Sequence, residues 1–225
     1  NPDDDTAFTR VVNFPTRGIG ARSLEALQDA ARTWNTPLYQ TVPHLAGKPA
    51  GYLYHQLLNF RDGRRHYELM TRLVDPLTDA YLMEIAQHFA ALDLPYPAPQ
   101  PVSVPPTVVK RGEALAHQGD TQRRIPACVQ CHGTSLTGVA PGIPGLLGLP
   151  RDYLNAQLGA WQTGQRRAHA PDCMADIAQR MDAADVTAVA AWLAAQPVPG
   201  GGKPAATLPA RPASAQHWQA GCPWT

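Results

Sequence analysis

Apolar side chains recur at helical spacing along the second half of the chain. Leu154, Leu158 and Trp161 stand at positions i, i+4 and i+7, which places them on one face of a helix. A second such stretch follows Asp182, a predicted N-cap, and Pro197 predicts its end. Its apolar positions are Met181, Val186, Val189 and Leu193. This periodicity predicts an all-α fold.

The same pattern occurs earlier in the chain. A shift of 101 residues pairs Pro43 with Pro144, Tyr52 with Tyr153, Gln56 with Gln157, Phe60 with Trp161 and Arg65 with Arg166. Three extra residues then enter the second copy, and a shift of 104 pairs Met70 with Met174 and Leu82 with Val186. An internal repeat of this kind predicts two copies of one helical unit.

The segments outside the repeat differ in composition. Residues 94–110 are rich in proline and predict a semi-rigid linker between the two copies. Residues 198–225 have low complexity and predict a mobile tail. The chain begins at Asn1 rather than at a methionine, so we interpret it as a mature or excised piece.

Charge excludes some classes of function. The chain of 225 residues has 19 Lys and Arg against 18 Asp and Glu, which disfavours a dedicated nucleic-acid or membrane-surface protein. No apolar run approaches the roughly 18 residues that a membrane-spanning helix needs. The chemistry must therefore be sought in individual motifs.

The stretch ACVQCHG at residues 127–133 has three interpretations. It could be half of a zinc site, a thiol–disulfide redox pair or the attachment point of a covalent haem. A zinc site needs a second ligand pair, and the next candidates after His132 are His169 and Cys173. A redox pair would follow a buried strand, whereas HQGDTQRRIPA precedes Cys128. Haem attachment explains the order of the residues, because two thiols can bond the vinyl groups while the histidine ligates iron.

A haem iron with a histidine on one side needs a soft ligand on the other. Met174 lies in a proline-bearing loop just before an amphipathic helix, whereas Met181 begins the apolar set of that helix. We therefore interpret Met174 as the sixth ligand and Met181 as a core residue.

Residues 111–197 resemble one domain of a class I cytochrome c, most similar to the two-domain, dihaem kind of the bacterial periplasm. The motifs occur in the family's order: Cys128-x-x-Cys131-His132, Pro144 to Gly148, Tyr153 to Gln157, Gly164 to Arg166, and Met174-x-x-Ile177-Ala178. The resemblance implies that the Pro144 carbonyl accepts a hydrogen bond from His132. Trp161 and Arg166 complete the predicted cofactor-binding set, with Arg166 or Arg167 pairing with a haem propionate.

A dihaem protein should contain the attachment motif twice, but this sequence contains it once. The equivalent of residues 128–132 is residues 27–31, and no cysteine precedes Cys128. Residues 43–93 are thus predicted to be the distal half of a first cytochrome c domain that has no haem attachment. We expect this half-domain to be loosely packed or to lean on the second domain. We expect one covalent haem c per chain, with Met70 coordinating nothing.

Residues 1–42 have a different resemblance. Asp4-Asp5, Ala7-Phe8, Arg10 to Asn13 and Arg17 to Gly20 are similar to a segment of the UvrD/Rep-type DNA helicases. The chain has no G-x-x-x-x-G-K-[ST] loop that could cradle a nucleotide, so no motor activity follows. The hypothesis is a hybrid chain, and we expect it to bind no nucleic acid.

The predicted function is outer-sphere electron transfer in the periplasm, without enzymatic activity and with a positive midpoint potential. The expected partners are redox proteins on the dehydrogenase or terminal-oxidase side. One alternative is an open iron site that reacts with peroxide or binds small gases, and another is a non-functional hybrid with a helicase fragment. Cys173 and Cys222 remain as either a disulfide or free thiols.

Overall fold

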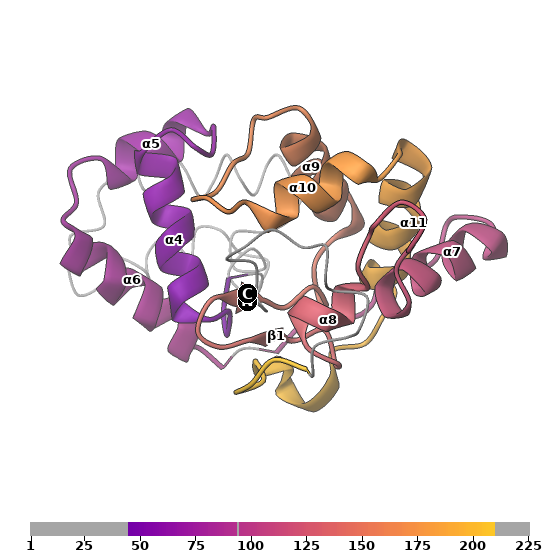
Figure 1. Ribbon diagram of the computed structural model, residues 1–225. Helices are drawn as coiled ribbons and strands as arrows, with labels where there is room; N and C mark the ends of the chain where they lie inside the picture. Colours follow the sequence, from indigo (N-terminus) through magenta and orange to yellow (C-terminus); the bar gives the residue numbers. More distant parts are fainter. Residues whose placement is uncertain (1–44, 94, 210–225) are drawn as a thin grey trace.

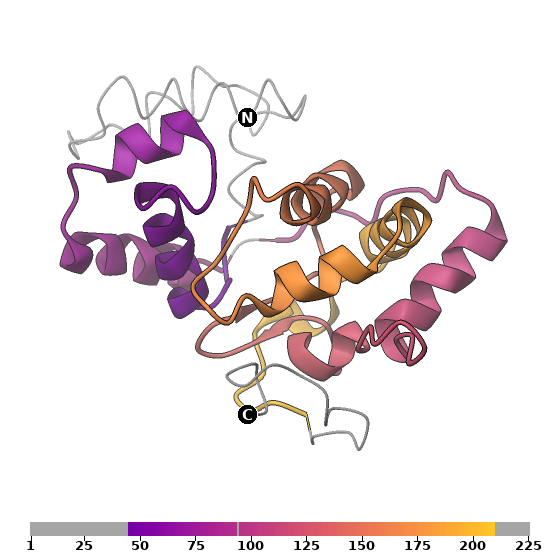
Figure 2. The same ribbon diagram turned by 45° about the horizontal axis from the view of Figure 1, so that its top comes forward.

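The computed structural model describes residues 45–93 and 95–209, which form two helical lobes (Figures 1 and 2). The helicase-like segment 1–42 and residues 210–225 of the predicted tail lie outside the described residues. The first lobe contains α4 (Ala50–Arg61), α5 (Glu68–Val74) and α6 (Asp79–Ala91). The second contains α7 (Pro106–His117), α8 (Cys128–His132), β1 (Gly138–Val139), β2 (Ile143–Pro144), α9 (Arg151–Gln162), α10 (Cys173–Arg180), α11 (Ala183–Ala194) and the 3₁₀ turn η2 (Pro199–Gly202). The all-α prediction is confirmed.

Helices α6 and α11 begin at side-chain caps that the sequence supplies. The Oγ1 of Thr78 accepts a hydrogen bond from the backbone N–H of Tyr81 at the start of α6. Asp182 accepts from the N–H of Asp185 at 2.8 Å in the same way at the start of α11, as predicted. Caps at equivalent positions show that the repeat extends to the local structure of the two lobes.

The first lobe has a small core. Phe60, Val74 and Leu82 are buried together where α4 packs against α5 and α6. Met70 packs against this cluster as a partly buried hydrophobic residue. It therefore contributes to the packing of the lobe.

The second lobe has a larger core, built on the crossing of α7 and α11. Gly112 of α7 lies so close to α11 that a Cβ there would be 2.2 Å from the carbonyl oxygen of Ala188. Helix α11 is rich in alanine, and small residues allow this close approach. The buried core residues are Leu115, Ala116, Ile125, Leu136, Leu147, Leu149, Leu154, Met181, Val186, Val189, Ala190, Trp192, Leu193 and Ala194.

Charged residues stabilise the same crossing at one end. Asp185 is only 3% exposed and accepts hydrogen bonds from the guanidinium groups of Arg111 and Arg123. Arg111 also pairs with Asp120 at 2.8 Å, and this hydrogen bond is the main reason that the pKa of Asp120 is lowered to about 2. The network links the middle of α7, the loop that follows α7 and the start of α11.

The two lobes meet through the residues that follow α4 and α9. Arg65 and Arg166 form an antiparallel bridge. The N–H of His66 donates to the Gln165 carbonyl at 3.0 Å, and the N–H of Arg167 donates to the Arg64 carbonyl at 2.7 Å. The first lobe thus leans on the second through equivalent positions of the repeat.

Three boundaries differ from the sequence-based expectations. Helix α7 begins at Pro106, inside the predicted 94–110 linker, because proline is well suited to the first turn of a helix. Helix α10 begins at Cys173, so Met174 lies in its first turn rather than in the preceding loop. Within the expected tail 198–225, Ala205 donates to the Gly138 carbonyl and accepts from the Ala140 N–H, so this part is bound to the domain.

The crossing of α7 and α11 predicts the effect of adding one methyl group. Gly112→Ala would place a Cβ against backbone atoms of Ala188 and 2.8 Å from the Trp192 Cβ. We expect the free energy of unfolding to fall by about 1–3 kcal/mol, as for other overpacked cores. Denaturant unfolding of the haem-loaded protein, followed by circular dichroism, measures this. Exposed Lys110→Ala on the same helix is the control and should change stability by less than about 0.5 kcal/mol. Equal stability of the two variants would contradict the close crossing.

Candidate functional site

Helix α8 presents two cysteines and a histidine within five residues. Cys128 and Cys131 are free, partly buried thiols. Burial raises the pKa of Cys128 to about 11 and that of Cys131 to about 12. A thiol–disulfide redox pair needs a lowered thiol pKa, so these values disfavour that interpretation.

Zinc is disfavoured by the surroundings of the motif. Within residues 45–93 and 95–209, no group of three or more His, Cys, Asp or Glu side chains could hold a metal ion. The three residues of α8 therefore lack the ligands that a structural zinc site requires.

His132 is held in one orientation by the backbone. The side chain is 6% exposed, and its Nδ1 lies 2.7 Å from the carbonyl oxygen of Pro144. A carbonyl can only accept, so Nδ1 carries the proton and Nε2 has its lone pair available for a metal. Burial lowers the pKa of His132, and the positive charge of Lys48 lowers it further. The neutral ring required of a metal ligand is thereby favoured.

A short hairpin places the Pro144 carbonyl beside the histidine. Strands β1 and β2 pair antiparallel, with Gly138 opposite Pro144. Gly138 has φ of +95°, and a Cβ at this position would lie 2.5 Å from the Ile143 carbonyl oxygen. Only glycine allows this tight turn, which brings β2 back over α8.

Trp161 and Arg166 lie together at the end of α9. The Arg166 guanidinium stacks 3.8 Å from the centroid of the Trp161 ring, and Arg166 is only 4% exposed. Among residues 45–93 and 95–209, the buried indole Nε1 of Trp161 finds no hydrogen-bond partner, and neither does Oδ1 of Asn155. A buried N–H is costly when it is unpaired, so the Trp161 indole indicates an acceptor supplied by a bound group.

The two candidate methionines differ in burial. Met181 is 8% exposed and belongs to the core, as predicted, whereas Met174 is partly exposed in the first turn of α10. Figure 1 shows α10 above and α8 below the centre of the second lobe. The assignment of Met174 as the iron ligand stays a prediction. Cys173 is disulfide-bonded, and its candidate partner Cys222 lies outside the described residues.

The structure also brings together residues that sequence reasoning did not assign to the site. Arg65 of the first lobe donates to the Oε1 of Gln56 at 3.0 Å and to the Oε1 of Gln157 at 2.8 Å. Arg166 donates to the same two oxygens at 3.0 and 2.6 Å. The repeat pairs Gln56 with Gln157 and Arg65 with Arg166, so a signal was present, but it did not show that the two copies face each other.

Comparisons with known proteins agree with this geometry. The family profile described as cytochrome c matches residues 109–196. A thiosulfate dehydrogenase electron acceptor from Thiomonas intermedia is 38% identical over 176 residues, which cover 78% of this chain and 76% of that protein. The chain belongs to the cytochrome c family.

Other members of the family match across both lobes. A cytochrome c4 from Pseudomonas aeruginosa is 33% identical over 156 residues, which cover 67% of this chain and 74% of that protein. The solved structure of a thiosulfate dehydrogenase from Marichromatium purpuratum has a TM-score of 0.61 and 37% identity. The matched region covers 68% of this chain and 32% of that longer chain. This cytochrome is accordingly an electron-transfer protein of the haem c type.

The helicase resemblance is supported in part. An ATP-dependent DNA helicase from Bacillus subtilis is 33% identical over 86 residues, which cover 35% of this chain but 12% of the helicase. A match to so small a part of the helicase does not establish a hybrid, which remains a hypothesis. In the described parts of the cytochrome, no helix has the length and apolar character needed to cross a membrane.

Proposed function

We propose that this cytochrome is a periplasmic electron carrier with one haem c, attached through Cys128 and Cys131 and ligated by His132 and Met174. The hydrogen bond between His132 Nδ1 and the Pro144 carbonyl at 2.7 Å carries the proposal. It directs the Nε2 lone pair away from the hairpin, on the same short helix that presents both thiols.

The residues present fit this cofactor in three respects. A covalently bound porphyrin needs two thiols close together, and α8 supplies two that are free and uncharged. Its iron needs a neutral imidazole of defined tautomer, which His132 supplies. Its propionates need hydrogen-bond donors, and Trp161 has an unpartnered buried N–H next to the guanidinium of Arg166.

Each residue has a separate task in electron transfer. Bound haem c supplies a one-electron ferrous–ferric couple. His132 holds its ring in one orientation, which minimises rearrangement between the two oxidation states. A Met174 thioether and a buried environment both favour the less charged ferrous state and so raise the reduction potential. With His132 and Met174 both serving as ligands, the chain would leave no place for a substrate at iron and would act by docking to redox partners.

The names of the relatives indicate a class of electron donor. The relatives from Thiomonas intermedia and Stutzerimonas stutzeri are electron acceptors of thiosulfate dehydrogenase. We therefore propose that this cytochrome accepts electrons from an oxidoreductase of that class in the periplasm.

The haem content tests the proposed cofactor. A pyridine haemochrome assay on protein produced with haem-attachment machinery should show one haem per chain that resists extraction by acidified acetone. The double variant Cys128→Ser and Cys131→Ser should lose the covalent haem, because no other cysteine precedes Cys173. Two haems per chain would contradict the single attachment site, and none would refute the haem c proposal.

The sixth ligand is tested by replacing a methionine. Met174→Ala should retain covalent haem but lose the long-wavelength charge-transfer band of methionine-ligated ferric haem. Its midpoint potential should fall by roughly 0.1 V or more, within the about 0.8 V range that axial ligands span. Absorption spectra and redox titration measure both effects. Met70→Leu is the matched control from the repeat and should leave both unchanged. A wild-type protein that lacks the band and binds carbon monoxide rapidly would instead support an open iron site.

The donor is tested by direct reduction. Oxidised cytochrome mixed with thiosulfate and a catalytic amount of a purified thiosulfate dehydrogenase should become reduced, with the ferrous absorbance as the measurement. Thiosulfate alone is the control and should reduce it at least about tenfold more slowly, a difference in barrier of about 1.4 kcal/mol. If an artificial acceptor is reduced in the same mixture and the cytochrome is not, the proposed donor class is wrong.

A further inference from the structure

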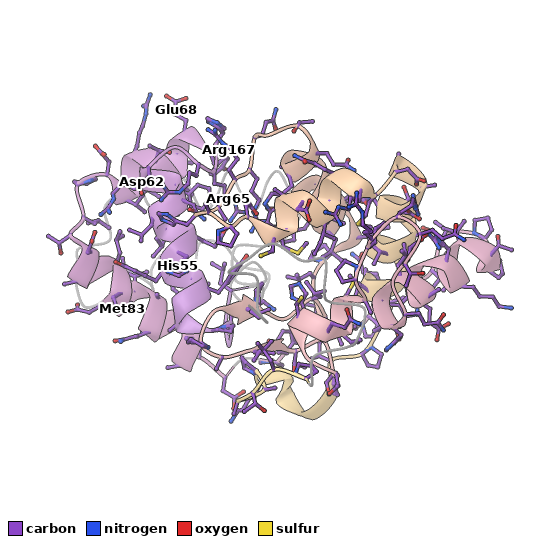
Figure 3. All side chains as sticks on the ribbon, viewed as in Figure 1. His55, Asp62, Arg65, Glu68, Met83 and Arg167 are labelled. Atoms are coloured by element: carbon purple, nitrogen blue, oxygen red, sulfur yellow. The ribbon has the colours of Figure 1, made fainter. Side chains whose placement is uncertain are left out.

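Two arginines from different lobes share one hydrogen-bond network at the lobe boundary. Arg65 follows α4 and Arg166 follows α9, and their backbones form the antiparallel bridge that joins the lobes. Figure 3 shows Arg65 on the side of the first lobe that faces the second, whereas Met83 lies toward its outer edge. The two guanidinium groups share Gln56 and Gln157 as acceptors, and Arg166 also donates to the Tyr52 hydroxyl at 3.3 Å.

In the described part of the chain, the hydrogen-bond acceptors of both arginines are neutral. The acceptors are amide and hydroxyl oxygens, and the stacking partners are the rings of Phe60 and Trp161. Among the described residues, neither Arg65 nor Arg166 forms a salt bridge, although arginines elsewhere on both lobes do, as at Arg61 and Arg111. A buried cation is costly unless an anion compensates it, and Arg166 is 4% exposed. Among the described residues no carboxylate compensates this charge, so the network is suited to receive an anion.

The electrostatics of a neighbouring side chain agree with this conclusion. Burial alone would raise the pKa of the Tyr153 hydroxyl, but the charges of Arg65 and Arg166 lower it overall. Both guanidinium charges thus act on the same place, and the Trp161 indole, without an acceptor among the described residues, adds a donor beside it. Two guanidinium groups and an indole N–H match carboxylates, which accept bidentate hydrogen bonds.

The haem proposed above carries two carboxylates, its propionates, and this inference rests on that proposed function. We propose that Arg65, from the lobe with no haem-attachment motif, completes with Arg166 the propionate site of the haem held by the second lobe, and thereby raises its reduction potential. In this sequence both copies of the repeat supply an arginine, while only the second supplies the Cys-x-x-Cys-His motif. The two positive charges consequently serve one haem.

The effect on the potential follows from charge. Oxidation adds one positive charge at iron, and a nearby guanidinium disfavours that state. Removing Arg65 leaves propionate charge less compensated and so stabilises the ferric form. For one unit charge acting through partly desolvated protein, a change of about tenfold in the ferrous–ferric equilibrium is expected, which is ~59 mV for one electron.

The experiment compares three variants of the holoprotein by redox titration. Arg65→Gln removes the positive charge. Arg65→Lys keeps the charge but replaces the planar guanidinium group with an ammonium group. Arg72→Gln removes one charge from an exposed position of the same lobe, where Arg72 pairs with Glu68 in α5. The haem spectrum and thermal unfolding are recorded for each variant, so that a change in ligation or folding is detected separately.

We expect Arg65→Gln to lower the reduction potential, with a change of about tenfold in the ferrous–ferric equilibrium constant. For Arg65→Lys this constant should stay within about threefold of the wild-type value, and for Arg72→Gln it should be unchanged. An unchanged potential in Arg65→Gln, with reduced thermal stability, would show that the network only joins the lobes and would overturn the proposal. Equal shifts in Arg65→Gln and Arg65→Lys would also overturn it, because geometry rather than charge would then be responsible. If Arg65→Gln does not fold, a large shift of the potential in Arg65→Lys would by itself overturn the proposal, because the charge is kept in that variant. Absence of haem from the wild type would refute the proposed function itself.

Discussion

One hydrogen bond, from His132 Nδ1 to the Pro144 carbonyl, determines what α8 can do. Without it the imidazole could rotate or exchange its tautomer, and the spacing of the two cysteines would be a local pattern without a defined metal ligand. The bond requires the hairpin to return over α8, which depends on the positive φ of Gly138. The hairpin is in turn fixed from its other side by the pairing of Ala205 with Gly138 and Ala140. A single side-chain orientation therefore depends on segments that are far apart in the sequence.

The frame beneath α8 is rigid for a different reason. Helices α7 and α11 approach closely enough to exclude a side chain at Gly112, and the alanines of α11 let the two backbones approach. Buried Asp185 then joins this crossing to the loop before α8 through Arg123. Close packing and a satisfied buried carboxylate both resist deformation, because each alternative leaves a void or an unpaired charge. Helix α8 is thus attached to a closely packed part of the second lobe.

The boundary between the two lobes, in contrast to this closely packed crossing, is polar. Its centre is occupied by two guanidinium groups and their neutral acceptors, where a core of apolar side chains would have been more stable on its own. Such a boundary is understandable if an anionic group belongs there. It also explains how the first lobe, whose main buried cluster is the small one of Phe60, Val74 and Leu82, holds a definite position. It is aligned by directional hydrogen bonds and a backbone bridge. The copies of the repeat face each other, so equivalent residues meet.

The sequence alone determined the features that depend on near neighbours in the chain. Helix periodicity, the Asp182 cap and the Cys128 to His132 spacing are local, because a helical turn and a haem-attachment motif both involve residues a few positions apart. The offset of the repeat could also be determined from the sequence, and it paired Arg65 with Arg166 and Gln56 with Gln157. Only the tertiary structure decided that these pairs meet, that the Trp161 N–H has no partner, and that Ala205 pairs with the hairpin. Contacts between residues about 100 positions apart arise from how the two lobes pack against each other. Local patterns along the chain do not reveal that relative orientation.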